Sequence, residues 1–409
     1  MNIRSINSEA VHALGRMGQL DGLRAIAVFA VIAQHTLPPE NPLSSLRLGS
    51  HAVHLFFVLS GFLITAILLS ARDRCENGGY QMRHVLKAFY LRRALRIFPA
   101  YYLILAIAFI VGVEDLRGSW EWHFSYLTNV YLAIRGTGHG AVTHLWSLAI
   151  EEQFYIVWPL VVLLMPRRWL STTLSVTVLT GPLFRLGMWN LTQNVKSTTM
   201  LMPACADFLG TGAILAYLSR NHVPDASTAR VAAYICGGSA ALWAFSLQFS
   251  ESATLVISGL IEAAFFASVI YLCANSMTGV FGRVLNAAPL RFVGLISYGI
   301  YLIHHFIPYF FVALERRFDV WSRFPLTHGW ASFVAVSVVS TLFAALSWQL
   351  IEAPINSFKR FFPYVPSGKT GKGGASQAAD ADVMLSSAPV DTTHSANRCR
   401  SAPTPEQKQ

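Results

Sequence analysis

The sequence is poor in charged residues and in cysteine. Only 13% of its 409 residues are Asp, Glu, Lys or Arg, whereas soluble domains carry about 25%. The five cysteines form no C-x-x-C pair, so neither a disulfide framework nor a cysteine-ligated zinc site is predicted. No A-x-A-like cleavage site follows the first apolar run, so we expect no cleavable signal peptide. These shortages exclude a series of soluble domains and a disulfide-rich scaffold.

Apolar residues, in contrast, are abundant. They make up 54% of the chain, and the mean hydropathy is +0.45. We therefore predict an all-α integral membrane protein, a bundle of about ten transmembrane helices. Windows of about 20 apolar residues predict spans at 20–37, 51–70, 99–114, 145–165, 169–189, 203–219, 230–248, 254–274, 292–313 and 330–351.

The distribution of Lys and Arg sets the expected orientation. These residues are more frequent in the loops that lie inside when the N-terminus is cytoplasmic, as the positive-inside rule requires. The net charge of +10 is then loop charge rather than a nucleic-acid patch. We expect a short cytoplasmic segment at 1–19, a membrane domain at 20–363 and a disordered cytoplasmic tail at 364–409, which is rich in Gly, Ser, Ala, Thr and Pro.

Charged residues lie inside the first predicted span. Arg24 and His35 are eleven residues apart, which returns to within about 20° of the same helix face, about 16 Å further along. Asp21 lies on that face too, three residues before Arg24. Charge within a membrane is costly and usually marks a site or pathway. Alternatively, Arg24 marks the cytoplasmic helix end and His35 reaches the opposite interface.

A second polar group opens the fourth span. Ser147, Glu151 and Tyr155 follow at four-residue intervals and share one helix face, with His144 one turn earlier. Glu152 points elsewhere, so Glu151 is the better candidate for a functional carboxylate. The alternative is that the helix dipole stabilises both acids near the helix N-terminus.

The loop at 71–98 holds seven basic residues. Its second half alternates apolar and cationic residues at helical spacing, which predicts an amphipathic helix on the inner membrane surface. Arg93 and Arg96 share a face of that helix, directly after Arg92. Guanidinium groups suit phosphates, so a nucleotide-like or CoA ligand is one interpretation. Binding of anionic lipid is the other.

Two further segments contain candidate residues. Tyr301 shares a face with His304 or His305 in the ninth span, where hydrogen-bonded packing is the alternative to a functional role. Glu352 lies at the inner end of the last span, where it could simply pair with basic loops. Polar residues within apolar spans that fit no motif are Arg185, Asp207 and Glu262.

Seven short segments, in order along the chain, resemble acyltransferase family 3, a family of polytopic membrane O-acyltransferases. They extend over residues 20–355, nearly the whole predicted membrane domain. Each segment alone is a weak signal, but seven in the correct order are specific. The matching segments are Asp21–Arg24, Arg24–His35, Phe56–Leu63, Arg92–Tyr102, His144–Tyr155, Ser297–His304 and Ile351–Pro354.

The resemblance implies transfer of an acyl group, often acetyl, from acyl-CoA to a hydroxyl of a saccharide or secondary metabolite. The residues that it implies as catalytic are His35, Arg24 and Glu151. Those that it implies at the acyl-CoA donor are Arg93, Arg96 and Arg92. Side chains expected at the acceptor are Trp146, Ser147, Tyr155, Tyr301, His304 and Glu352.

We therefore expect an O-acetyltransferase of a bacterial inner membrane that acts on a cell-surface or exported saccharide or glycolipid. Acyl-CoA is expected as a co-substrate, with no permanently bound cofactor, no metal and no nucleic-acid partner. His35 would act as a general base or would itself carry the acyl group; the sequence leaves both open. Some family members have an extracellular hydrolase-like domain that these residues do not include, so direct transfer by the membrane domain is expected.

Two alternatives remain at this stage. The acceptor could instead be a macrolide-like metabolite or a lipo-oligosaccharide signal. A non-enzymatic alternative is a transporter of polar solutes, in which the same intramembrane polar residues line a path.

Overall fold

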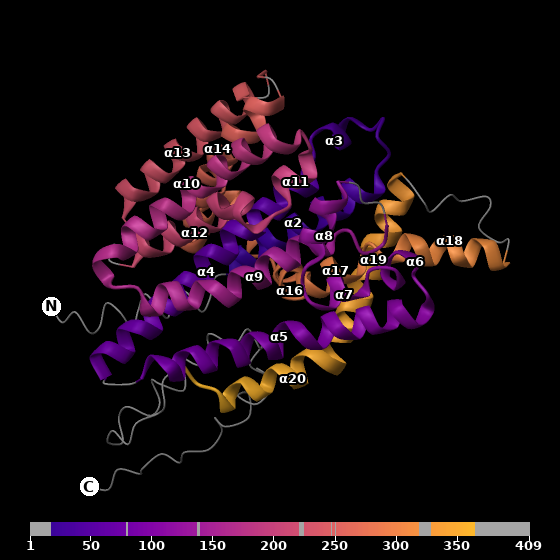
Figure 1. The fold of residues 1–409 in the computed structure, drawn as a ribbon, viewed down its shortest axis with the longest axis horizontal. Helices are drawn as coiled ribbons and strands as arrows, with labels where there is room; N and C mark the ends of the chain where they lie inside the picture. The colour runs from indigo at the N-terminus through magenta and orange to yellow at the C-terminus, as the bar shows by residue number, and fades with distance from the viewer. Residues whose placement is uncertain are drawn as a thin grey trace, which may run out of the picture.

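The computed structural model describes residues 18–78, 81–136, 140–220, 225–246, 248–249, 251–318 and 329–364, and its regular elements within these ranges are helices (Figure 1). Six helical stretches in this part of the chain are long and apolar enough to cross a membrane, which supports an integral membrane protein. The expected count of about ten spans is not confirmed. The six are Leu48–Gly78, Met82–Val111, Leu145–Leu164, Met202–Ser219, Val256–Ala274 and Trp330–Phe361.

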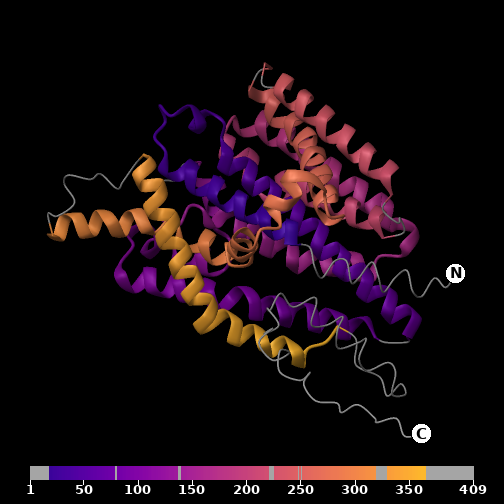
Figure 2. The same ribbon diagram turned by 180° about the vertical axis from the view of Figure 1, so that it is seen from behind.

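The helix α2 (Gly18–Thr36) lies at the centre of the molecule beside α4 (Leu48–Gly78) (Figures 1 and 2). It also packs against α16 (Ala288–Leu295), α17 (Ser297–Ile303) and α19 (Trp330–Ser347). The apolar run in the sequence predicts this buried position. In the structure, Ala, Val and Ile side chains of α2 are fully buried on several sides of the helix. The helix that carries Arg24 and His35 is therefore surrounded by other helices.

Four helices cover one side of this centre: α10 (Arg167–Thr192), α12 (Ala206–Ser219), α13 (Ala226–Ser246) and α14 (Glu251–Ala274) (Figure 1). The contact between α4 and α12 is unusually close. A Cβ atom on Gly61 would lie 2.0 Å from the carbonyl oxygen of Leu209, and one on Gly212 would lie 2.1 Å from that of Val58. Small residues of this kind allow helix backbones to touch within a membrane.

On the other side, α5 (Met82–Val111) runs beside α20 (Ala353–Ser357) in both views (Figures 1 and 2). The predicted boundary at residue 99 is wrong. The basic segment at 82–98 and the predicted span at 99–114 form one helix that continues through Pro99. The arginines of this segment are consequently held by the same helix as the apolar run.

The prediction of one span at 292–313 is also wrong. This segment divides into α16, α17 and α18 (Ile307–Phe318), with breaks at Ile296 and after Ile303. The last predicted span continues beyond α19 as the π-helical segment η2 (Trp348–Glu352), followed by α20 and η3 (Phe358–Phe361). A hydropathy window averages across such breaks and cannot detect them.

The bounds of the first and fourth predicted spans match those of the helices α2 and α9 (Leu145–Leu164) to within two residues, although α2 is not among the six candidate membrane stretches. Of the terminal segments expected at 1–19 and 364–409, only residues 18, 19 and 364 are described. The shorter helices of the connections are α3 (Pro42–Ser45), α6 (Glu114–Arg117), α7 (Trp120–Phe124), α8 (Thr128–Arg135), α11 (Val195–Thr199), η1 (Met202–Cys205) and α15 (Gly279–Leu285).

Candidate active site

Arg24 and His35 lie on the same uninterrupted helix, so their eleven-residue spacing places them on one face of α2. Arg24 Nη1 donates to Asp21 Oδ1 over 3.1 Å, as the i, i+3 spacing predicts. Arg24 and His35 belong to two different polar groups, one near each end of α2.

The arginine layer consists of Arg24, Arg93, Arg96, Glu151 and Glu352. Arg24 of α2 and the two arginines of α5 interact electrostatically with Glu151 of α9. Glu352, in η2, interacts with Arg96 and accepts a hydrogen bond of 2.9 Å from Ser347. Segments that are far apart in the sequence thus bring three cations and two carboxylates together in the membrane domain.

Glu151 is held by a chain of hydroxyl groups. Ser60 Oγ, on α4, donates to Glu151 Oε1 over 2.6 Å. Because the Ser60 proton is used in this way, Tyr155 must donate its own hydroxyl proton to Ser60 Oγ, 2.9 Å away. The guanidinium of Arg93 in turn lies over the Tyr155 ring, 5.1 Å from its centroid. These contacts orient the carboxylate toward the arginines.

Two arginines of this layer keep their N–H groups available. Arg93 contacts the rings of Phe89 and Tyr155, but within the described ranges neither Arg93 nor Arg96 donates a hydrogen bond to a protein acceptor. Both side chains are half-buried, so their N–H groups can still be reached by a ligand, and each guanidinium offers five donors. The arrangement therefore suits an anionic ligand, and phosphate groups fit the bidentate geometry of arginine.

The histidine layer consists of His35, His144, His304 and His305. His35 Nδ1 lies 3.0 Å from His304 Nε2, and the two rings are stacked with centroids 5.1 Å apart. The ring of His305 meets the His35 ring edge-on, with centroids 4.6 Å apart. The rings of His144 and His304 meet edge-on, with their centroids 5.1 Å apart.

The hydrogen bonds fix the tautomers of this layer. His304 Nδ1 lies 2.6 Å from the carbonyl oxygen of Tyr301, which can only accept, so this nitrogen carries a proton. In the neutral ring Nε2 of His304 is then an acceptor, and His35 Nδ1 must donate to it. The lone pair of His35 consequently lies on Nε2, which is the nitrogen that can accept a proton or attack an electrophile.

Backbone carbonyls orient the two other histidines. His144 Nε2 donates to the oxygen of Leu302 over 3.1 Å, and His305 Nδ1 donates to that of Ala141 over 3.1 Å. Tyr301, which is also bonded to Ser147 over 2.6 Å, links α17 to the start of α9. The breaks on either side of α17 thus allow this short helix to hold the histidine layer.

The predicted site residues fall into three sets. Arg24, Arg93, Arg96, Glu151, Tyr155 and Glu352 belong to or contact the arginine layer, and His35, His304, Tyr301 and Ser147 belong to or contact the histidine layer. Arg92 lies apart, because its guanidinium donates to the carbonyls of Lys359 and Phe362. Trp146 packs its ring edge against Phe57, with centroids 6.1 Å apart.

Sequence reasoning gave no role to Ser60, which the structure places directly on Glu151. A hydroxyl in the middle of the apolar segment Phe56–Leu63 is the signal that could have found it. It also left His144 and His305 outside the site. Glu152 makes no hydrogen bond to the partners of Glu151 among the described residues, but its charge acts on Arg93 of the arginine layer as well as on Tyr101, Tyr102 and Tyr298.

A family model described as an acyltransferase domain matches residues 17–349. The chain belongs to this acyltransferase family. No solved structure matches it significantly.

Several curated relatives are similar over most of the chain. The peptidoglycan O-acetyltransferase OatA of Listeria monocytogenes is 28% identical over 377 residues, which are 84% of this chain and 56% of that protein. The putative peptidoglycan O-acetyltransferase YrhL of Bacillus subtilis is 27% identical, over 83% of this chain and 54% of its own length. The O-acetyltransferase OatA of Staphylococcus aureus is 26% identical, over 86% and 59%. The chain thus spans little more than half the length of these relatives.

Proposed function

We propose that this protein is a membrane O-acetyltransferase that transfers an acetyl group from cytoplasmic acetyl-CoA to a hydroxyl of a cell-wall or exported saccharide. The observation that carries the proposal is that the two ends of α2 contribute to different layers, Arg24 to the arginine layer and His35 to the histidine layer. At one end are arginines whose N–H groups have no acceptor in the described part of the chain, and at the other is a histidine whose Nε2 has no partner there. A phosphate-bearing donor and a hydroxyl acceptor are the reactants that such a pair of layers suits.

The arginine layer would bind the donor. Arg93 and Arg96 would bond the phosphates of CoA, since their donors have no acceptor in the described protein and each charged hydrogen bond contributes about 1.5–3 kcal/mol. With the N-terminus inside, this layer lies toward the cytoplasm, where acetyl-CoA is found. Arg24, on the helix that leads to His35, would bind the donor or stabilise the charge that develops on the thioester oxygen.

The histidine layer would perform the transfer. His35 Nε2 accepts the proton of the acceptor hydroxyl, the hydroxyl oxygen bonds to the acetyl carbon, and the C–S bond breaks to release the CoA thiolate. The thiolate then takes the proton from the imidazolium. His304 stabilises that imidazolium by accepting from its Nδ1–H. If His35 instead carries the acetyl group, the same nitrogen forms the bond, and an acid-quenched reaction would contain an acetylated His35 peptide.

The names of the relatives support a saccharide as the acceptor. Two of the curated relatives are named as acting on peptidoglycan, a saccharide polymer outside the cytoplasmic membrane. The histidine layer lies toward that side in the proposed orientation. Ser147 and Tyr301 would contribute hydroxyl groups to bind a sugar.

The test uses cells that lack the protein and cells that regain it. Mass spectrometry of peptidoglycan fragments and of exported saccharides should show acetyl esters that disappear with the gene and return with the wild-type protein. They should not return with His35→Gln, although that variant inserts normally. Unchanged esters on every saccharide, together with loss of uptake or export of a polar solute, would replace the proposal by the transporter alternative.

A further inference from the structure

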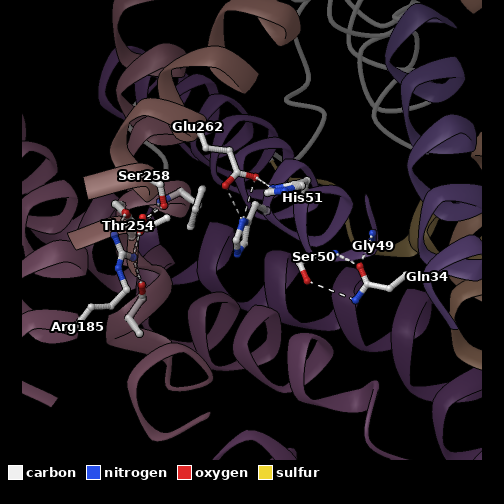
Figure 3. Close-up of polar contacts among 12 residues, drawn as sticks. Gln34, Gly49, Ser50, His51, Arg185, Thr254, Ser258 and Glu262 are labelled. Carbon is white, nitrogen blue, oxygen red and sulfur yellow. Dashed lines mark hydrogen bonds and ion pairs between the residues drawn. The ribbon is translucent and has the colours of Figure 1, made fainter. Parts of the chain in front are cut away.

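A second polar cluster lies outside the two layers, where α4 meets α14. His51 and His54, on α4, both direct Nδ1 at Oε1 of Glu262, on α14, over 2.7 and 3.0 Å (Figure 3). The carboxylate is buried, with 6% of its side chain exposed, whereas each imidazole is 24% exposed. Neither the proposed donor site nor the transfer chemistry uses these three residues.

The carboxylate requires a positive charge. Burying an anion without compensation is costly, yet no lysine or arginine among the described residues bonds Glu262. Among the described residues only the two imidazoles reach it, and an imidazole brings a charge only when it is protonated. The nearby guanidinium of Arg185 is already used, since it donates to both carboxylate oxygens of Asp207. A cation at the centre of the cluster would meet this requirement.

The geometry suits a transition-metal ion. The three donor atoms lie within 4.8 Å of one another, and ligand atoms around tetrahedral Zn²⁺ stand about 3.4 Å apart when the bonds are about 2.0–2.1 Å. The hydrogen-bonded N···O pairs, now 2.7 and 3.0 Å long, would therefore open by about 0.7 and 0.4 Å, and any donor atoms that stand further apart than about 3.4 Å would have to approach each other. His51 and His54 are three residues apart on one helix, and a carboxylate from a facing helix completes the set, as in metal sites within helical bundles.

The imidazoles are oriented by aromatic side chains. The His54 ring stacks on Phe208 with centroids 4.0 Å apart, and the His51 ring meets Trp243 edge-on at 4.8 Å. Metal binding would require each Nδ1 to release its proton, and a neutral ring can do this by moving the proton to Nε2. This shift gives up the two Nδ1–H···Glu262 hydrogen bonds, and bonds from each Nδ1 and from the carboxylate to the ion would replace them. The ring edges that carry Nε2 have no bonded partner in the described protein, so the shift costs no contact there.

We propose that His51, His54 and Glu262 form a site for a divalent transition-metal ion such as Zn²⁺, with water in the fourth coordination position. The ion would clamp α14 to the first turn of α4. That turn is also tied to α2, because Gln34 Oε1 accepts from the backbone N–H groups of Gly49 and Ser50 (Figure 3). The ion would thus stabilise the end of α2 that carries His35 without contacting a substrate. The proposal does not depend on the proposed acetyl transfer.

The experiment is a titration of the purified full-length protein, stripped with a chelator, with Zn²⁺ and Co²⁺. Metal content and the Co²⁺ absorption spectrum are measured for the wild type, for the double variant His51→Ala/His54→Ala and for Glu262→Gln. His84→Ala is the matched control, since within the described residues the one hydrogen-bond partner of the His84 imidazole is the carbonyl of Pro363. The wild type and the control should bind one equivalent and gain thermal stability with metal. The double variant should bind at least about a hundredfold more weakly, because even outer-shell changes cost 10–100-fold.

Glu262→Gln guards against a folding artefact, since its amide oxygen still accepts an imidazole N–H and keeps the two helices joined. It should be folded and yet bind metal weakly. Absence of stoichiometric binding by the wild type would overturn the proposal. So would wild-type affinity in the double variant or in Glu262→Gln, because the metal would then occupy the histidine layer instead.

Discussion

Arg185 of α10 differs from Arg93 and Arg96 of α5 in how the guanidinium N–H groups are used. Arg185 of α10 donates to Asp207 over 3.1 and 2.6 Å and to the carbonyls of Ala204 and Val256 (Figure 3). Arg93 and Arg96 of α5 donate to no acceptor in the described protein. The difference teaches that arginine within a membrane protein serves two purposes. An arginine surrounded by protein acceptors joins helices, and one without them is available to a ligand.

Histidines show the same contrast. His123 of α7 is buried and has both nitrogens occupied, by Ser119 Oγ at 3.0 Å and Thr128 Oγ1 at 2.9 Å. It holds the connection between α5 and α9 in place. Within the described residues His35 has only Nδ1 engaged, by His304, which leaves Nε2 for chemistry. Available donors and lone pairs, rather than burial alone, distinguish the candidate site.

The largest expected effect follows from removing the arginine that is paired with Asp207. Arg185→Leu would leave the Asp207 carboxylate, which is fully buried, without its cation. Breaking a buried pair in this way costs about 3–5 kcal/mol, so little folded protein should be recovered in detergent, as judged by size-exclusion chromatography. Arg93→Leu, the matched change at an arginine without protein acceptors, should be recovered like the wild type. Equal recovery of the two variants would contradict the distinction between an arginine that joins helices and one that is available to a ligand.

The second effect concerns the donor. Arg93→Ala and Arg96→Ala should each raise the KM for acetyl-CoA by about 10–100-fold with little change in kcat, since each removes a charged hydrogen bond of about 1.5–3 kcal/mol. Arg92→Ala is the control, because Arg92 is bonded to backbone carbonyls of the segment after α20 and should alter stability but not KM. If KM is unchanged in the two site variants while membrane association falls, these arginines anchor lipid.

A smaller effect is expected at His304, which positions His35. His304→Leu removes the acceptor for His35 Nδ1–H and should lower kcat by about 10–100-fold, the usual cost of an orienting partner. The KM for acetyl-CoA should not change. His304→Gln, whose amide oxygen can accept the same proton, should restore part of the rate. A purely structural role predicts equal losses in both variants, accompanied by lower stability.

The smallest effect is the pH dependence of His123. Burial lowers the pKa of His123 to about 4, below the usual value of about 6.5. Since the folded pKa is the lower one, the stabilisation is complete above the unfolded pKa and decreases as the pH falls toward 4. Between about pH 7 and pH 5.5 the loss should be about 1 kcal/mol. His123→Gln should lose less stability than the wild type over this range in thermal denaturation; an identical pH dependence would argue against a neutral, buried His123.

Much of the fold could be predicted because apolar runs end at polar residues. The predicted spans at 20–37 and 145–165 match α2 and α9 closely. The prediction failed where tertiary contacts override the local pattern. α5 continues through Pro99, and the segment at 292–313 is broken so that α17 can present His304 to His35. Hydropathy indicates which segments are apolar enough to lie in lipid. It contains no information about which side chains of other segments they contact.

The site itself was predictable only one helix at a time. Helical spacing placed Arg93 and Arg96 on one face and separated Glu151 from Glu152. It could not indicate that His35 meets His304, since these residues are 269 positions apart. Glu262 was noticed as a polar residue without a motif, because its partners His51 and His54 lie on another helix. Pairings between helices come from packing, which a single sequence does not show.

The most direct test of the central claim separates donor binding from transfer in one preparation. Purified wild type, His35→Gln and Arg93→Ala/Arg96→Ala are incubated with labelled acetyl-CoA and a peptidoglycan-derived saccharide, and bound donor and acetyl ester are measured separately. His35→Gln should bind acetyl-CoA normally and transfer at least about 10²–10⁴-fold more slowly, the contribution of a general acid–base group. The arginine double variant should instead lose donor binding. Near-normal transfer by His35→Gln would contradict the assignment of the chemistry to this histidine.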